Sequence, residues 1–210
     1  MIKKMNKPFV LIGAGGHGMV IAEILEAMGE GIFCFTDDHP LLTAQLGYTV
    51  IQNLEALDDT ESKQFIISIG NNAIRKKISE AHALHYGRAI HPSAQLSSRA
   101  SVGEGTVVMA GVCVNSSTTI GKHCILNTQC SIDHECVLED FVHVSPGAAL
   151  AGNIKVGAGT HIGIGASVIP GITIGKWCTI GAGAVVLNDV PDYSTVVGVP
   201  GKVIKTKTHE

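Results

Sequence analysis

Aliphatic residues recur at every sixth position through the second half of the chain. From Ile90 to Val186, seventeen successive hexapeptides each begin with Ile, Leu or Val. A second series, from Ala94 to Val190, lies four places later in each hexapeptide and contains no residue larger than Ile. An amphipathic helix repeats every 3.6 residues and a half-buried strand every two, so neither explains a period of six. The pattern is typical of a parallel β-helix with short sides and a narrow core.

Three hexapeptides per triangular coil would give a prism of about 5.7 coils. A thin core also explains why aromatic residues make up only 4% of the chain although apolar residues make up 45%. The repeat begins abruptly near Ile90, which argues for a separate unit before it. We therefore predict two domains, residues 1–88 and residues 89–210, and an all-β fold for the second.

The first 88 residues show alternating strand and helix patterns instead. Strands are predicted over residues 9–12, 32–35 and 65–69, with a weaker strand over 48–51 followed by a short helix. Longer helices are predicted over residues 17–28 and 73–84. This alternation is typical of a small parallel sheet covered by helices. We expect an α/β domain that resembles half of a Rossmann fold.

A glycine-rich turn joins the first predicted strand to the first helix, with the G-x-G-x-x-G spacing that brings phosphates to backbone amides at a helix N-terminus. A domain of this size supplies only one of the two halves of a dinucleotide site, so the nucleotide end of a nucleotide-sugar fits better. The alternative is that the glycines only allow close packing and that Asp37 and Asp38 are exposed acids at the end of a strand. The candidate residues here are Gly13, Gly15, Gly16, His17, Gly18, Asp37 and Asp38.

Charge and cysteine content narrow the choice of partners. A net charge of -3 gives no reason to expect nucleic acid or a membrane as partner. The apolar run over residues 9–12 is too short for a secretory signal, so a cytoplasmic location is expected. Four of the six cysteines occupy the small inward position of the repeat, which favours packing over zinc or disulfides. They are Cys124, Cys130, Cys136 and Cys178.

The strongest candidate for catalysis is His134, which carries a carboxylate on each side. An imidazole with an ordinary pKa near 6.5 can remove a proton at neutral pH. A carboxylate bonded to its other nitrogen fixes the tautomer and raises the basicity. We predict His134 as a general base and favour Glu135 over Asp133 as the orienting group, although spacing alone does not separate the two.

Two further histidines, His143 and His161, lie one predicted coil apart. Their 18-residue separation would stack the two side chains at the spacing of neighbouring strands, about 4.8 Å. With a third ligand from a neighbouring subunit such a pair could hold zinc, as in a hydratase of the gamma-class carbonic anhydrase type. The glycine turn of the first domain argues against this alternative, because a hydratase needs no nucleotide domain.

The hexapeptides, followed by the segment Val197–Lys202, resemble the left-handed β-helix acyltransferases. Within that group the whole chain resembles the nucleotide-sugar acetyltransferases related to the bacillosamine-pathway N-acetyltransferase and to the sialic acid O-acetyltransferases. The segments that carry this resemblance are the glycine turn with His17, Asp37–Asp38, Gly70–Asn71–Asn72 with Arg75, Asp133–His134–Glu135 and His143–Val144–Ser145.

The resemblance implies a homotrimer in which acetyl-CoA lies between adjacent β-helices and the N-terminal domain holds the nucleotide-sugar, with no metal. It implies that a backbone amide near Gly152 stabilises the oxyanion. The residues implied for acetyl-CoA are His143, Gly152, Gly181, Gly183 and Lys202. The residues implied for the nucleotide-sugar are those of the glycine turn, Asp37, Asp38, Asn71, Arg75 and Asn127.

The resulting hypothesis is N-acetylation of the 4-amino group of a nucleotide-linked 4-amino-4,6-dideoxy sugar for glycan biosynthesis. O-acetylation of a sialic acid or another sugar hydroxyl is the nearest alternative. A hydroxyl is far less acidic than an ammonium, so its proton is harder for the same base to remove. A non-catalytic nucleotide-binding scaffold is a third interpretation. The nucleotide base, the sugar stereochemistry and the length of the acyl group stay open.

Overall fold

The computed structural model describes residues 7–206. It begins with a five-stranded sheet in the order β3-β4-β2-β1-β5, in which only β3 is antiparallel. The strands are β1 (Phe9–Ile12), β2 (Ile32–Thr36), β3 (Ala44–Gln45), β4 (Tyr48–Ile51) and β5 (Gln64–Ile67). The helices are α1 (Gly16–Met28) and α2 (Asn72–Ala81), with two short 3₁₀ helices, η1 (Leu54–Ala56) and η2 (Thr60–Ser62). The predicted half-Rossmann arrangement is confirmed.

Local sequence explains the limits of these elements. All four residues of β1 are buried, as a central parallel strand requires. Helix α1 ends at Gly29, whose φ of 74° is the left-handed conformation that closes many helices. Helix α2 begins where the Asn71 side chain accepts a hydrogen bond from the Ile74 amide. It ends at Ala81, three residues earlier than predicted, because the next residues return to pair Tyr86 with Phe65 beside β5.

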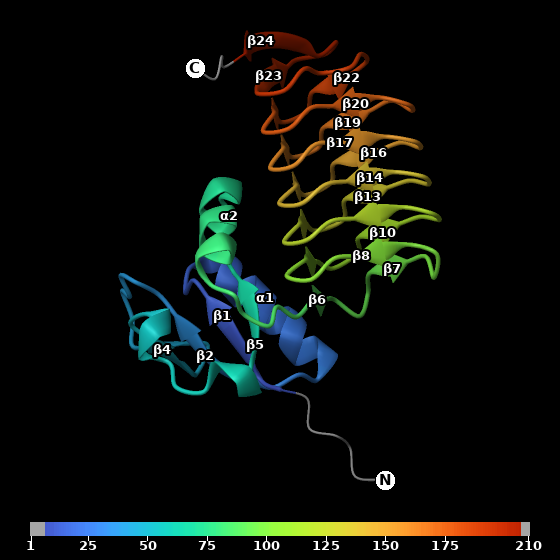
Figure 1. The fold of residues 1–210 in the computed structure, drawn as a ribbon. Coiled ribbons are helices and arrows are strands. Elements are labelled where there is room, and N and C mark those ends of the chain that lie inside the picture. Colours follow the sequence, from blue (N-terminus) through green and yellow to red (C-terminus); the bar gives the residue numbers. More distant parts are fainter. Residues whose placement is uncertain (1–6, 207–210) are drawn as a thin grey trace.

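A parallel β-helix follows (Figure 1), as predicted, with three two-residue strands in each coil. Strands pair with partners 18 residues away, for example Val114 with Ile132. The strands are β6 (Ala89–Ile90), β7 (Gln95–Leu96), β8 (Ser101–Val102), β9 (Val107–Val108), β10 (Cys113–Val114), β11 (Thr119–Ile120), β12 (Ile125–Leu126), β13 (Ser131–Ile132), β14 (Val137–Leu138), β15 (His143–Val144), β16 (Ala149–Leu150), β17 (Lys155–Val156), β18 (His161–Ile162), β19 (Ser167–Val168), β20 (Thr173–Ile174), β21 (Thr179–Ile180) and β22 (Val185–Val186).

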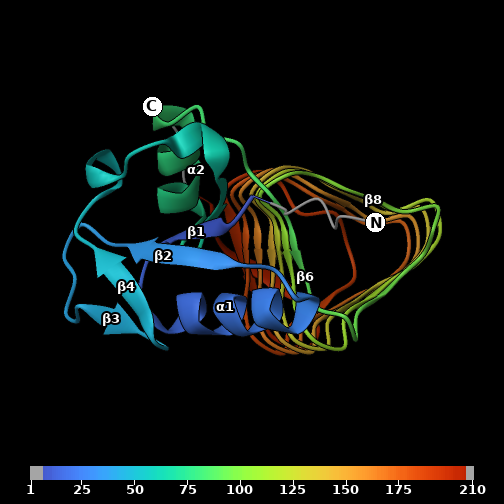
Figure 2. The ribbon, with the colours of Figure 1, turned by 90° about the horizontal axis from the view of Figure 1, so that it is seen from below.

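Three sheets form the sides of the β-helix, and its coils superpose when seen along the axis (Figure 2). The first sheet contains β6, β9, β12, β15, β18 and β21, and it continues into β23 (Ser194–Val197) and β24 (Lys202–Thr206). The second sheet runs from β7 to β22 and the third from β8 to β20. The closing pair β23 and β24 is antiparallel.

The interior is a single column built from both inward series of the repeat. Cys124, Cys130, Cys136 and Cys178 are buried free thiols within it, so they pack as predicted. Thr118 occupies the same inward position and its hydroxyl donates to the Asp133 carbonyl at 2.7 Å, which satisfies the polar group.

The N-terminal sheet packs against the first coils through apolar residues. Outward side chains of the first sheet, Ala89, Val107 and Ile125, join a buried cluster with Ile21 and Leu25 of α1. The N-terminal domain therefore covers the lower part of the first sheet, and α2 lies alongside the coils (Figure 1). Within residues 7–206, no helix combines the length and apolar character that a membrane span requires.

Candidate active site

His134 lies in the turn between β13 and β14, at the corner where the second sheet passes into the third. Asp133 holds the backbone of this turn, because its Oδ1 accepts hydrogen bonds from the His134 amide at 2.8 Å and from Asn115 Nδ2 at 2.7 Å. Thr118 fixes the Asp133 carbonyl from the coil below. Sequence reasoning missed Asn115 and Thr118, although Asn115 precedes Asp133 by one 18-residue coil.

Glu135, not Asp133, contacts the imidazole. Its Oε2 lies 3.0 Å from Nδ1 of His134, so the carboxylate holds the proton on Nδ1 and leaves Nε2 as the basic nitrogen. Glu135 has a φ of 58°, but residues at other corners of the β-helix share this left-handed conformation, so it is a property of the coil rather than of the site. The pair is more than half exposed on one chain.

Gly152 sits one coil above His134, and its missing side chain gives the imidazole room. A Cβ at this position would lie 2.6 Å from Cε1 and 2.7 Å from Nε2 of the ring. The basic edge of His134 therefore lies directly against Gly152. The Gly152 carbonyl accepts from the Gly171 amide, whereas the Gly152 amide makes no hydrogen bond to another of the described residues 7–206. A free amide beside the basic nitrogen is suited to binding an oxyanion.

The glycine turn divides into two kinds of position. A Cβ on Gly13 would lie 2.9 Å from the Ile69 side chain, and a Cβ on Gly18 would lie 2.6 Å from the Gly13 carbonyl, so both are needed for packing. A Cβ on Gly15 or Gly16 would meet no atom within 4 Å, so these two glycines border open space. Packing explains the outer two glycines, and a ligand could approach the middle two.

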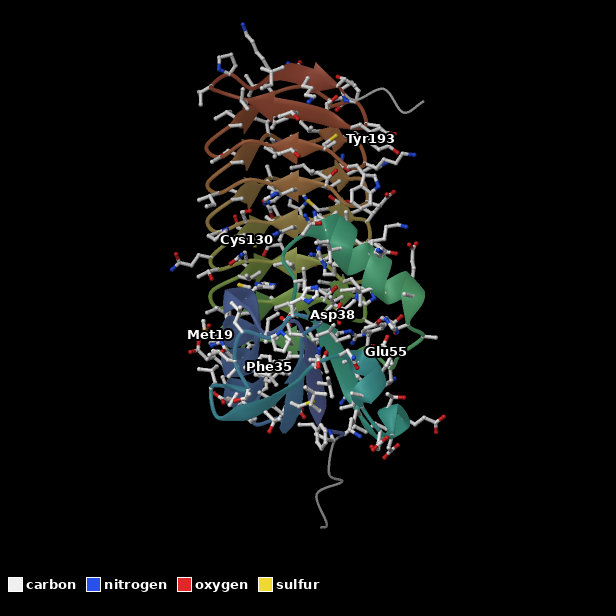
Figure 3. The ribbon with its side chains drawn as sticks, turned by 90° about the vertical axis from the view of Figure 1, so that its left-hand side faces the viewer. Met19, Phe35, Asp38, Glu55, Cys130 and Tyr193 are labelled. Atoms are coloured by element: carbon white, nitrogen blue, oxygen red, sulfur yellow. The ribbon has the colours of Figure 1, made fainter. Side chains whose placement is uncertain are left out.

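The two aspartates after β2 differ in the same way. Asp37 accepts hydrogen bonds from the Ala14 amide at 2.9 Å and from the His39 amide at 3.0 Å, so its carboxylate holds the glycine turn in place. Asp38 is exposed at the edge of the N-terminal sheet that faces the coils (Figure 3). Of the pair, Asp38 is the one open to a ligand.

A cluster of neutral histidines joins the N-terminal domain to the first sheet. The rings of His143 and His161 stack with centroids 4.7 Å apart, as their spacing predicted. Asn127 Nδ2 lies 3.3 Å from His143 Nε2, and Ser145 Oγ lies 2.8 Å from His161 Nε2. His17 Nε2 is buried without a hydrogen-bond partner among the described residues.

Burial keeps these imidazoles uncharged. Burial, followed by the neighbouring His161, Arg75 and His17, lowers the pKa of His143 to about 3, although the Gly70 backbone opposes the shift. Burial and then the charge of Arg75 lower the pKa of His17 to about 4. No group of three side chains suited to a metal ion occurs within residues 7–206, and a protein polar group contacts Nε2 of each stacked histidine. These contacts favour hydrogen bonding over zinc binding.

Arg75 does not face the nucleotide site, where the resemblance implies that it should lie; it is buried between the N-terminal domain and the coils. Its side chain is 1% exposed, and its guanidinium donates to protein oxygens, including the carbonyls of His123 and Phe141. It therefore has no donor left for a nucleotide. Asn71 is exposed beside it at the start of α2, where its side chain caps the helix.

The candidate residues form two groups on opposite sides of one chain. The glycine turn, Asn127 and the stacked histidines lie at the first sheet, whereas His134 and Gly152 lie at the opposite corner of the prism. Gly181 and Gly183 follow β21 in the upper coils, and exposed Lys202 begins β24. A cleft of about 850 Å³ between α2 and the coils near Trp177 contains none of the His134 turn.

Family models match a segment in each half of the chain. Residues 8–82 match the family model of the PglD N-terminal domain, and residues 153–188 match that of the bacterial transferase hexapeptide with six repeats. A histidine variant of perosamine N-acetyltransferase from Caulobacter crescentus, solved with CoA and GDP-perosamine, is 39% identical. The match covers 94% of this chain and 97% of that one, with a TM-score of 0.90.

The chain belongs to the hexapeptide-repeat sugar N-acetyltransferases. The acetyltransferase domain of PglB from Neisseria gonorrhoeae, solved with acetyl coenzyme A, is also 39% identical, covers 95% of this chain and 100% of that chain, and has a TM-score of 0.90. UDP-N-acetylbacillosamine N-acetyltransferase from Bacillus subtilis is 39% identical over 114 residues, which are 50% of this chain and 52% of that protein. The β-helix is thus the left-handed form of this family.

Proposed function

We propose that this chain transfers an acetyl group from acetyl-CoA to the 4-amino group of a nucleotide-linked 4-amino-4,6-dideoxy sugar. The observation that carries the proposal is the His134–Glu135 pair, whose basic edge lies against Gly152 in a member of this family. The relatives solved with ligands contain CoA and GDP-perosamine or acetyl coenzyme A, which supports both substrates.

The chemistry follows from the geometry of the turn. The sugar nitrogen attacks the thioester carbonyl and His134 Nε2 takes the proton that the nitrogen must lose. Glu135 stabilises the imidazolium that results, because its carboxylate lies 3.0 Å from Nδ1. The Gly152 amide donates to the oxyanion, and the thiol of CoA leaves after it receives the proton from His134.

A homotrimer with sites between subunits accounts for the separation of the two groups. On one chain the glycine turn and His134 lie on opposite sides of the prism, so the two groups do not face a common site within that chain. The glycine turn, Asp38 and Asn127 of one subunit would hold the nucleotide-sugar against His134 of its neighbour, with acetyl-CoA beside His143, Gly181, Gly183 and Lys202. Asn71 borders the acceptor from the start of α2. Cross-linking or sedimentation should give three chains per particle.

The experiment is acetyl transfer to a panel of GDP-, UDP- and dTDP-linked amino sugars, measured as thiol release from acetyl-CoA. His134→Ala should lower kcat about 100-fold or more while acetyl-CoA still binds, because the variant loses the base and keeps the groove. His85→Ala is the matched control, since His85 is an exposed histidine far from the turn. Unchanged turnover in His134→Ala would remove this residue from the mechanism.

A further inference from the structure

Arg75 is the largest of the fully buried side chains and lies in the first half of α2. A guanidinium has five N–H donors in a fixed planar fork. All five find acceptors here, and these acceptors lie on two different parts of the chain. The hydrogen bonds run from Nε to His123 O (2.7 Å), from Nη1 to Ile69 O (3.0 Å) and Gly70 O (3.3 Å), and from Nη2 to Asn72 Oδ1 (2.9 Å) and Phe141 O (3.0 Å).

These contacts join the loop after β5 to successive coils of the β-helix. The carbonyls of His123 and Phe141 belong to corners 18 residues apart, and Asn72 Nδ2 reaches the next corner by donating to the Gly159 carbonyl at 3.0 Å. None of the five acceptors is a carboxylate, so the charge is balanced only by carbonyl and amide dipoles. Burying a cation without a counter-ion costs free energy. What the arginine provides here is a fixed geometry between the loop and the coils, set by the planar guanidinium, and not a charge pair.

The loop held in this way borders the acceptor site. Residues 68–71 follow β5 at the carboxyl edge of the parallel sheet, which is where such sheets bind ligands. Ser68 Oγ donates to the Gly13 carbonyl at 2.6 Å, so the loop also touches the glycine turn. Gly70 and Asn71 are exposed, and the Gly70 backbone is near enough to His143 to raise the pKa of that imidazole against the effect of burial.

We infer that Arg75 is a positioning residue for the acceptor, which fixes the loop Ile69–Asn72 against the coils and never contacts the substrate itself. The inference rests on the proposed function, because it assigns this loop to the nucleotide-sugar. Arg75 sets the distance between the glycine turn of the N-terminal domain and the coil that carries His143. Lysine cannot replace it, since an ammonium has three donors and no fork.

The kinetic test compares Arg75→Met and Arg75→Lys with wild type. In both variants KM for the nucleotide-sugar should rise about tenfold or more, which corresponds to about 1.4 kcal/mol of binding lost when the loop is no longer held against the coils. KM for acetyl-CoA should stay within about twofold, since only His143 of the residues placed beside acetyl-CoA lies near this loop, whereas Gly181, Gly183 and Lys202 lie in the upper coils. Methylguanidinium added to Arg75→Ala should restore part of the lost activity. Arg88→Met is the matched control, because the exposed Arg88 also donates to a coil carbonyl, that of Gly103.

A second measurement needs no substrate and separates this inference from the proposed function. Amide hydrogen exchange over residues 69–74 should be faster in Arg75→Met than in wild type and in Arg88→Met. If Arg75→Met does not fold, Asn72→Ala removes one acceptor and the Gly159 contact and should show the same change more weakly. Unchanged exchange in both, or an equal rise of KM for both substrates, would overturn the positioning role. Wild type inactive towards every amino sugar would instead overturn the proposed function and leave the exchange test in force.

Discussion

Substituting Gly152 with alanine should misplace the His134 imidazole, which we propose as the general base, without disturbing the fold. The new methyl group would approach Cε1 of His134 to 2.6 Å, about 0.8 Å short of the 3.4 Å at which ordinary contact begins. The methyl belongs to a rigid corner, so the partly exposed ring must withdraw by nearly that amount or rotate away from Glu135. A misplacement near 1 Å costs on the order of 100-fold in rate. We therefore expect kcat to fall by about that factor.

The assay is steady-state thiol release, together with thermal unfolding of the same preparations. The backbone at Gly152 lies outside the left-handed region, so alanine adds no backbone strain there. The melting temperature should change little. Alanine lowers the conformational entropy of the unfolded chain, which stabilises the folded state by roughly 0.4–1 kcal/mol and offsets the cost of moving the exposed ring. Gly31→Ala is the matched control, since a Cβ at Gly31 meets only Pro8 at an ordinary 3.8 Å.

A kcat within about twofold of wild type in Gly152→Ala would refute this reasoning, because the ring would then tolerate a shift that proton transfer should not. A large loss of melting temperature would also count against it. In that case Gly152 would be needed for the coil itself and its closeness to His134 would carry no catalytic meaning.

Two further predictions concern charge. Glu135→Gln should lower kcat about tenfold or more, because a neutral amide lacks the negative charge that stabilises the imidazolium. Asp133→Asn should lower kcat less, since an amide oxygen can still accept from the His134 backbone amide. Stability should fall as the pH drops below about 6.5, because burial lowers the pKa of His123 to about 4, and the unfolded chain then binds the proton that the folded chain refuses. Between pH 6.5 and pH 4, His123 alone would lower the free energy of unfolding by roughly 3 kcal/mol. Denaturant unfolding at several pH values can measure this loss.

Variants of neighbouring or exposed residues serve as controls for both predictions. Equal losses in Glu135→Gln and Asp133→Asn would contradict the assignment of Glu135 as the orienting group. For the pH dependence, His123→Gln should make the acid limb shallower while His17 and His143 still contribute to it, and the exposed His85→Gln should leave it as in wild type. An acid limb of the same slope in His123→Gln would contradict the role given to burial.

The repeat could be read from the sequence because both of its inward series consist of residues that suit a thin core. A period of six with three sides fixes the pairing at 18 residues, and the structure pairs Val114 with Ile132 accordingly. The end of α2 could not be read in the same way. Leu84 and Tyr86 are apolar enough to continue a helix, yet they leave it to pack beside β5.

The site shows a similar limit. Two carboxylates flank His134 in the sequence, and only the path of the backbone through the corner decides that Glu135 reaches the ring. Arg75 was beyond sequence reasoning because its coil acceptors are backbone carbonyls 48 and 66 residues away, which no side-chain pattern reveals. The family resemblance implies that Arg75 contacts the nucleotide-sugar, but in the structure its contacts join two parts of the protein.

The most direct test of the account is the mass of the product formed from acetyl-CoA and a mixture of nucleotide-linked amino sugars. The account predicts that one 4-amino-4,6-dideoxy sugar gains a single acetyl group on nitrogen, with one thiol released for each. Acetyl found on a sugar hydroxyl, or no acetyl transfer to any nucleotide-linked amino sugar, would contradict it.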